Sequence, residues 1–192
     1  MKIRLQTKKE QREIARARVS GLSDKDVLSR RIAERVLSLE EYRRAESVMV
    51  YMSLPNEVDT RLILEDALKS KKVFVPVTLD TLKLISIDKN TRFIKGAFGV
   101  SEPEKGEEAM DVDFAVIPMV AYDPYGNRLG HGKGYFDKFL TDKKCLKAGI
   151  AFSAQEFERL AVADYDVKMD IIVNENETLD LRGVKQKGRT YY

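Results

Sequence analysis

The sequence predicts an α/β protein built on an open, mostly parallel sheet in three layers, with helices on both faces and a helical pair at the N-terminus. Short apolar runs alternate with segments of helical spacing along the chain. A strand, a helix and a second strand follow one another within residues 47–77, which is typical of a βαβ unit with parallel strands. The apolar run at residues 114–123 leads into a glycine-rich segment, and open sheets bind ligands where such strands end. With 192 residues, we expect a single α/β domain spanning residues 1–192.

The first part of that domain, residues 1–44, is predicted to be a helical segment packed on the sheet. Thr7 and Glu10 have the spacing of a capping box, which indicates a helix that continues to about Val19. Ser23 is expected to cap a second helix. The second helix carries apolar residues on one face, namely Leu28, Ile32 and Val36.

The rest of the chain supplies the sheet and its remaining helices. Apolar runs predict strands at residues 47–53, 72–77, 82–87, 114–123, 147–152 and 170–175. Helices are expected at residues 60–68, 134–144 and 155–160. Residues 88–113 are predicted to form a long irregular loop, and residues 183–192 a loose basic tail.

Composition narrows the class of protein. The N-terminus lacks the apolar segment of a secretory signal, and no apolar run approaches the ~18 residues of a membrane span. The single cysteine, Cys145, cannot form an intramolecular disulfide and suits a reducing compartment, so we expect a cytoplasmic protein without a membrane partner. Basic residues outnumber acidic ones in residues 1–44, which indicates either a solvated helix surface or attraction to a polyanion.

The most informative segment is RLGHGKGYFD, residues 128–137, hereafter the glycine loop. Its glycines alternate with His131 and Lys133, and they permit both positive φ and close backbone approach to a ligand. Successive backbone N–H groups in such a turn bind anions, and a helix starting at Gly134 would add its positive end. Lys133 supplies a positive charge and Asp137 could hold a metal ion on the same phosphates. The segment therefore predicts a nucleotide-phosphate loop.

Other interpretations of this loop remain open at the level of sequence. Gly134 follows Lys133 where a P-loop has Ser or Thr, and Tyr135 stands where the dinucleotide fingerprint has its third glycine. The segment could be a left-handed turn between a strand and a helix. It could also serve a different ATP-dependent kinase or a nucleotide-sensing protein without turnover. A nucleic-acid-binding module is disfavoured, because residues 1–41 contain no aromatic residue to stack on bases.

The glycine loop and four other segments together carry a resemblance to a known family. RLGHGKGYFD resembles a family loop RLGxGKGYYD, and MSLPNEVDT resembles a substrate-binding turn that contains a glutamate. Three further segments, KKEQR, GAFGVSEPE and VKMDIIV, resemble a KxxLR nucleotide motif, a GxxGxxEP segment and a strand with a second acidic metal residue. These patterns are similar to those of the 5-formyltetrahydrofolate cyclo-ligase family, also called methenyltetrahydrofolate synthetases. The likeness covers nearly the whole chain.

The resemblance assigns roles to particular positions. It implies an ATP site that comprises Lys8 or Lys9, Arg12, Arg128, Leu129, Gly130, His131, Gly132, Lys133, Gly134, Tyr135 and Phe136. It implies a folate site that comprises Met52, Glu57, His131, Gly132, Lys133, Gly134 and Tyr135. Mg²⁺ would be held by Asp137 and Asp170, and Lys133, Arg128 and Tyr135 would act on the reacting groups. Only Lys8 keeps the family spacing to Arg12.

The implied activity is the ATP- and Mg²⁺-dependent conversion of 5-formyltetrahydrofolate to 5,10-methenyltetrahydrofolate. In that reaction the formyl oxygen is phosphorylated, N10 closes the ring, and ADP and phosphate are released. The expected partners are ATP and the folate, with or without a polyglutamate tail, and neither nucleic acid nor a second copy of the chain. The sequence departs from the family pattern at Gln11, which matters little if that position lies on a helix surface, and at Phe136, which lacks the tyrosine hydroxyl.

Overall fold

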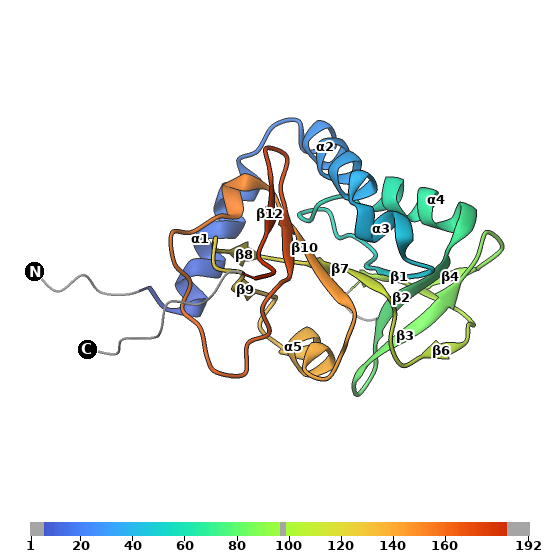
Figure 1. Cartoon of the computed structure of the whole chain (residues 1–192). Coiled ribbons are helices and arrows are strands. Elements are labelled where there is room, and N and C mark those ends of the chain that lie inside the picture. Colours follow the sequence, from blue (N-terminus) through green and yellow to red (C-terminus); the bar gives the residue numbers. More distant parts are fainter. Residues whose placement is uncertain (1–5, 97–98, 184–192) are drawn as a thin grey trace, which may run out of the picture.

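A single eight-stranded sheet forms the centre of the molecule (Figure 1). The computed structural model describes residues 6–96 and 99–183. The strand order is β12-β11-β10-β7-β1-β2-β3-β6, and the five strands from β11 to β2 are parallel. The parallel strands are β1 (Ser47–Val50), β2 (Lys72–Thr78), β7 (Phe114–Pro118), β10 (Leu146–Ile150) and β11 (Ile171–Val173). Antiparallel strands close both edges, namely β3 (Leu82–Ile87), β6 (Glu108–Ala109) and β12 (Thr178–Asp180).

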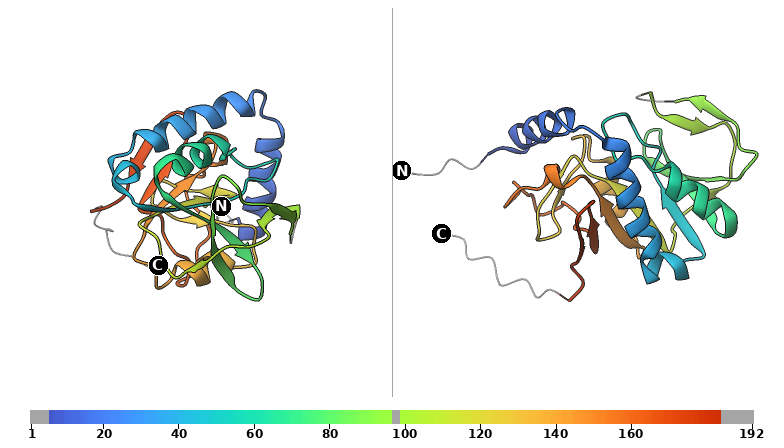
Figure 2. Two further views of the ribbon diagram at one scale, coloured as in Figure 1. Left: turned by 90° about the vertical axis from the view of Figure 1, so that its right-hand side faces the viewer. Right: turned by 90° about the horizontal axis from the view of Figure 1, so that it is seen from above.

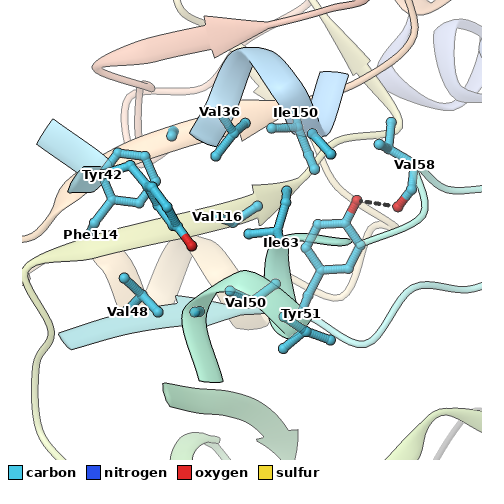
Figure 3. Close-up of a cluster of buried hydrophobic side chains, with 14 of the residues drawn as sticks. Val36, Tyr42, Val48, Val50, Tyr51, Val58, Ile63, Phe114, Val116 and Ile150 are labelled. Carbon is cyan, nitrogen blue, oxygen red and sulfur yellow. Dashed lines mark hydrogen bonds between the residues drawn. The ribbon is translucent and has the colours of Figure 1, made fainter. Parts of the chain in front are cut away.

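The central strands are buried on both faces, which explains why they read as continuous apolar runs. In β1, Val48 and Val50 face one core cluster while Met49 faces another. Figure 3 shows the first cluster, in which Val48 and Val50 pack near Phe114 of the neighbouring strand β7. The Tyr51 hydroxyl donates a 3.0 Å hydrogen bond to the Val58 carbonyl, which ties the segment after β1 to the core.

Helices cover both faces of the sheet, as expected (Figures 1 and 2). One face carries α2 (Lys25–Ser38), α3 (Glu40–Arg44) and α4 (Arg61–Ser70), and the other carries α5 (Tyr135–Leu140). The three-layer, mostly parallel α/β fold is therefore confirmed. None of the helices in the described ranges is long and apolar enough to cross a membrane.

The first helix, α1 (Lys8–Ser20), begins with the predicted capping box of Thr7 and Glu10. It packs beside the short hairpin of β8 (Ala121–Tyr122) and β9 (Arg128–Leu129) and beside the 3₁₀ turn η2 (Ser153–Gln155). Gln11 is 3% exposed, so it does not lie on the helix surface. Its side-chain amide donates to the Arg159 carbonyl at 3.0 Å and accepts from the Ala161 N–H at 2.9 Å. Gln11 thus fastens α1 to the segment that follows η2.

Several local predictions differ from the structure. Residues 88–113 contain β4 (Phe93–Lys95), β5 (Ser101–Pro103) and β6, and Figure 2 shows the β4–β5 hairpin projecting from the body. The helix expected at residues 155–160 does not form. The 3₁₀ turn η2 ends at residue 155, and the backbone of the residues after it bonds to Gln11 and to the buried Asp123. Asp24, not Ser23, precedes α2, and its side chain forms no cap. Of the predicted basic tail, residues 184–192 lie outside the described residues.

Candidate active site

A cavity of about 870 Å³ opens at the carboxyl ends of the parallel strands. Tyr51 after β1, Thr78 at the end of β2 and Pro118 at the end of β7 all line it. The glycine loop crosses its middle. Figure 1 shows α1 and strands β1 and β2 on opposite sides of the β9–α5 segment. We call the part lined by Lys8, Arg12, Tyr165 and Asp166 the α1 end, and the part lined by Met52, Leu54, Glu57, Pro76 and Thr78 the β1 end.

The glycine loop takes backbone conformations that favour glycine. Gly132 has φ 108° and Gly134 has φ 72°, both in the left-handed region. Any other side chain would be strained there. From the side of α1, the Arg12 Nε–H donates a 2.7 Å hydrogen bond to the Gly130 carbonyl. The glycines thus permit the conformation of the loop, and the cationic side chain of Arg12 stabilises it.

Arg128, at the start of the loop, is a buried cation. Its side chain is 1% exposed and its Nη2 lies 3.1 Å from Asp137 Oδ1. Burial lowers the pKa of the Arg128 guanidinium, while the nearby carboxylates of Asp137 and Asp166 oppose that shift. Its Nε–H is buried and finds no hydrogen-bond partner in the described part of the chain. A buried donor of this kind beside a cavity suits an anionic ligand.

Two acidic side chains line the cavity near Arg128, namely Asp166 at the α1 end and Asp137 at the end of the glycine loop. Asp166 lies 2.5 Å from Lys8 Nζ and accepts a 2.7 Å hydrogen bond from the Ala163 N–H. Asp137 accepts from Arg128 and, at 3.3 Å, from the Val167 N–H. Both carboxylates line the cavity, and each is paired with a cation.

The glycine loop and the glutamate turn meet at the β1 end. Glu57 is 11% exposed in its side chain, and its Oε2 accepts a 2.8 Å hydrogen bond from the Leu54 N–H. Its Oε1 lies 2.8 Å from His131 Nε2, in the middle of the glycine loop. The two segments follow different parallel strands, so their meeting at one sheet edge is the arrangement expected from the topology.

Most of the predicted site residues line this one cavity. They are Lys8, Arg12, Met52, Glu57, Arg128, Gly130, His131, Gly132, Lys133, Gly134, Tyr135, Phe136 and Asp137. Three predicted residues do not line it, namely Lys9, Leu129 and Asp170. Leu129 is buried in a small core cluster with Ala15, while Lys9 is exposed on the outer side of α1.

Asp170, expected to hold the metal ion, lies outside the cavity. Asp170 immediately precedes β11, and its carboxylate accepts a 2.8 Å hydrogen bond from the N–H of Lys147, in β10. It therefore stands at the amino ends of parallel strands, away from the edge that holds the cavity. Asp166, four residues earlier, is the carboxylate that lines the cavity. Sequence reasoning missed it because it lies in an irregular segment, and its one signal was another aspartate close to the expected position.

Comparisons with known proteins identify the family. The model of the 5-formyltetrahydrofolate cyclo-ligase family matches residues 1–175. A 5-formyltetrahydrofolate cyclo-ligase of Mus musculus is 27% identical over 166 residues, which cover 76% of this chain and 81% of that protein. A probable 5-formyltetrahydrofolate cyclo-ligase of Schizosaccharomyces pombe is 31% identical, over 70% of this chain and 72% of that protein.

Solved structures of methenyltetrahydrofolate synthetases have a similar fold. The solution structure of a 5,10-methenyltetrahydrofolate synthetase from Aquifex aeolicus superposes with a TM-score of 0.83 at 35% identity and covers 96% of both chains. A 5,10-methenyltetrahydrofolate synthetase from Mycoplasma pneumoniae superposes with a TM-score of 0.69 at 26% identity, covering 88% of this chain and 99% of that one. The chain studied here belongs to the 5-formyltetrahydrofolate cyclo-ligase family.

Proposed function

We propose that this protein converts 5-formyltetrahydrofolate to 5,10-methenyltetrahydrofolate, with consumption of ATP in the presence of Mg²⁺. One observation carries the proposal most directly. The glycine loop contacts Arg12 of α1 on one side and Glu57 of the turn after β1 on the other. A loop suited to phosphates thus lies between a cationic region and a carboxylate that is well placed for a second ligand. Membership of the family supports the same pair of substrates.

The α1 end and the glycine loop would bind the triphosphate. Lys8 and Arg12 stand one helical turn apart on the same side of α1, and Lys133 lies in the loop itself. Backbone N–H groups of the loop add neutral donors, and Arg128, which also lines the cavity, adds a positive charge. Phosphoryl transfer depends on alignment and charge neutralisation, which these groups supply without a covalent intermediate on the protein.

The residues present fit a magnesium ion bound together with phosphates. Mg²⁺ in nucleotide sites is held by one or two carboxylates, substrate oxygens and water. Asp137 and Asp166 both line the cavity beside the glycine loop. No cluster of three or more His, Cys, Asp or Glu side chains suited to a metal occurs in residues 6–96 and 99–183. When bound there, Mg²⁺ would neutralise charge on the triphosphate.

The β1 end would bind the folate. Met52, Leu54 and Pro76 provide apolar surface for its rings, and Glu57 provides a carboxylate for the paired N–H donors of the pterin. Both oxygens of Glu57 already have protein partners, Leu54 N–H and His131. A carboxylate oxygen has room for more than one donor, so the substrate can join these partners or replace His131.

These positions suggest how the chain promotes the reaction. The formyl group on N5 is a poor electrophile until its oxygen receives the γ-phosphoryl group of ATP. N10 then attacks the activated carbon, the ring closes and phosphate leaves with the former formyl oxygen. Lys133 and Arg12 would neutralise the negative charge of the γ-phosphoryl group while it passes from ADP to the formyl oxygen. Glu57 would hold the pterin in register, so that the formyl oxygen faces the loop.

A turnover assay tests the proposal. The protein is incubated with 5-formyltetrahydrofolate, ATP and Mg²⁺, and methenyl product, ADP and phosphate are measured together. We expect the three products in equal amounts, and none when ATP, folate or the divalent metal is omitted. Formation of AMP, or ATP hydrolysis that does not need the folate, would contradict the proposed reaction.

A further inference from the structure

Tyr165 is an aromatic residue of the cavity to which the reaction above gives no role. It lines the α1 end and is nevertheless 75% exposed. Its side chain therefore presents an open ring to any ligand that occupies this end. Single exposed aromatic residues are common on protein surfaces, but this ring is held in place and has charged neighbours.

The ring is attached to a firmly positioned segment. Lys8 Nζ lies 5.3 Å from the ring centroid, and the same Lys8 forms the ion pair with Asp166, the next residue. Further back along the segment, Gln11 is hydrogen-bonded to Arg159 and Ala161. Figure 1 shows this segment, in orange, running past the start of α1. Residues of α1 therefore contact the segment at two places, first at Arg159 and Ala161 and then at Asp166.

Tyr165 is connected to the glycine loop through two residues of α1. Lys8, which the ring contacts, is one helical turn before Arg12, and Arg12 binds the loop at Gly130. A nucleotide with its phosphates on the loop can therefore extend along α1 toward Tyr165. In the opposite direction it would enter the β1 end, where Glu57 and His131 already meet.

The other aromatic residues that line the cavity are committed elsewhere. Tyr51 is 3% exposed and its hydroxyl is bonded to the Val58 carbonyl. Tyr135 and Phe136 begin α5 and pack against the core cluster on that face of the sheet. Among the described residues that line the cavity, Tyr165 is the aromatic side chain that belongs to the α1 end.

We propose that Tyr165 is the platform on which the purine base of the nucleotide stacks. This inference rests on the proposed function, because it takes the glycine loop as the phosphate site. A tyrosine ring offers a π face to a flat base, and such stacking tolerates different bases because each has a π face. Lys8 and Asp166 then flank the sugar and phosphates, so one short segment serves both the base and the charged part of the ligand.

Direct binding measurements test this inference without turnover. Calorimetric titrations with MgATP and with magnesium tripolyphosphate, which has the phosphates but no base, are compared for wild type, Tyr165→Ala and Tyr165→Phe. Tyr165→Ala should bind ATP about 5- to 150-fold more weakly, which corresponds to the ~1–3 kcal/mol of one stacked base. Tripolyphosphate affinity should not change, and Tyr165→Phe should bind ATP like wild type.

Tyr125→Ala is the matched control. Tyr125 is 54% exposed and its ring lies 5.7 Å from the guanidinium of Arg159, so it resembles Tyr165 in exposure and in its cationic neighbour. It does not line the cavity. Its removal should leave ATP affinity unchanged, and an equal loss in both variants would overturn the proposal.

Three further results would overturn the stacking role. One is a Tyr165→Ala variant that binds ATP as tightly as wild type. Another is an equal loss of ATP and tripolyphosphate affinity, which would place the residue at the phosphates. The third is weaker binding of 5-formyltetrahydrofolate with normal ATP affinity. A protein that binds ATP through Tyr165 but forms no methenyl product would instead refute the proposed function and leave this inference standing.

Discussion

The two ends of the cavity are built from different kinds of contact. At the α1 end, charged side chains pair with one another, as in Lys8 with Asp166, and brace the backbone of the glycine loop through Arg12. At the β1 end, apolar side chains surround one nearly buried carboxylate, Glu57. Paired charges suit a ligand whose charge moves during reaction, whereas a fixed carboxylate in an apolar wall suits a flat ligand with N–H donors. The contrast supports the proposal that each end binds one substrate, with the glycine loop between them.

The largest effect on activity that would test this assignment of one substrate to each end is expected from a substitution in the glycine loop. Lys133→Met removes a charge where the phosphoryl group moves, so kcat should fall about 100- to 1000-fold, as for the loss of one transition-state donor. The folate KM should change little. Steady-state kinetics with each substrate varied in turn gives this separation. An unchanged kcat with a raised folate KM would assign Lys133 to the β1 end.

At the β1 end, Glu57→Gln replaces one acceptor oxygen with an amide donor. A substrate N–H would then face another N–H, a loss of ~1–3 kcal/mol, or about 5- to 150-fold in folate KM. ATP affinity, measured by calorimetry, should remain that of wild type. Weaker ATP binding in this variant would show that the two ends do not serve separate substrates.

A matched pair of aspartate variants tests the proposed metal site. Asp166→Asn should raise the Mg²⁺ concentration for half-maximal activity by about tenfold or more, since losing even an outer metal partner has an effect of that order. Asp170→Asn should keep the wild-type Mg²⁺ requirement, because Asp170 bonds to Lys147 and does not line the cavity. The reverse result would restore the expectation drawn from the sequence.

Two neighbouring lysines provide a second matched pair at the α1 end. Lys8 lines the cavity and Lys9 does not. Lys8→Met should raise the ATP KM about tenfold, the equivalent of one charge-assisted hydrogen bond at ~1.5 kcal/mol. Lys9→Met should leave it unchanged. Thermal unfolding of both variants would establish that the difference is not caused by a loss of stability.

The smallest effect is expected where the two ends meet. His131→Ala removes the contact with Glu57, but the His131 side chain is 51% exposed. A pair of this exposure contributes no more than ~1 kcal/mol, so folate KM should change by about fivefold at most. A change larger than that of Glu57→Gln would show that His131, and not Glu57, dominates recognition at the β1 end.

Much of the fold could be predicted because its signals are local. Strands such as β1 and β7 are buried on both faces, so their apolar runs stand out, and α1 has its capping box in the sequence. The short strands of residues 88–113 gave no such signal. In β4, Phe93–Lys95, all three residues are exposed, and the strand exists because it pairs with β5. Pairing with a distant partner leaves little pattern in a three-residue segment.

By itself, the sequence determined the central sheet and the glycine loop, and it placed both that loop and Glu57 after strands of the sheet. These follow from short-range spacing and from the rule that parallel strands end together. Only the tertiary structure decided that Asp166 and not Asp170 lines the cavity, and that Gln11 is buried. The physical reason is that residues 157–169 have no regular structure, and bonds from α1, about 150 residues away along the chain, position their side chains.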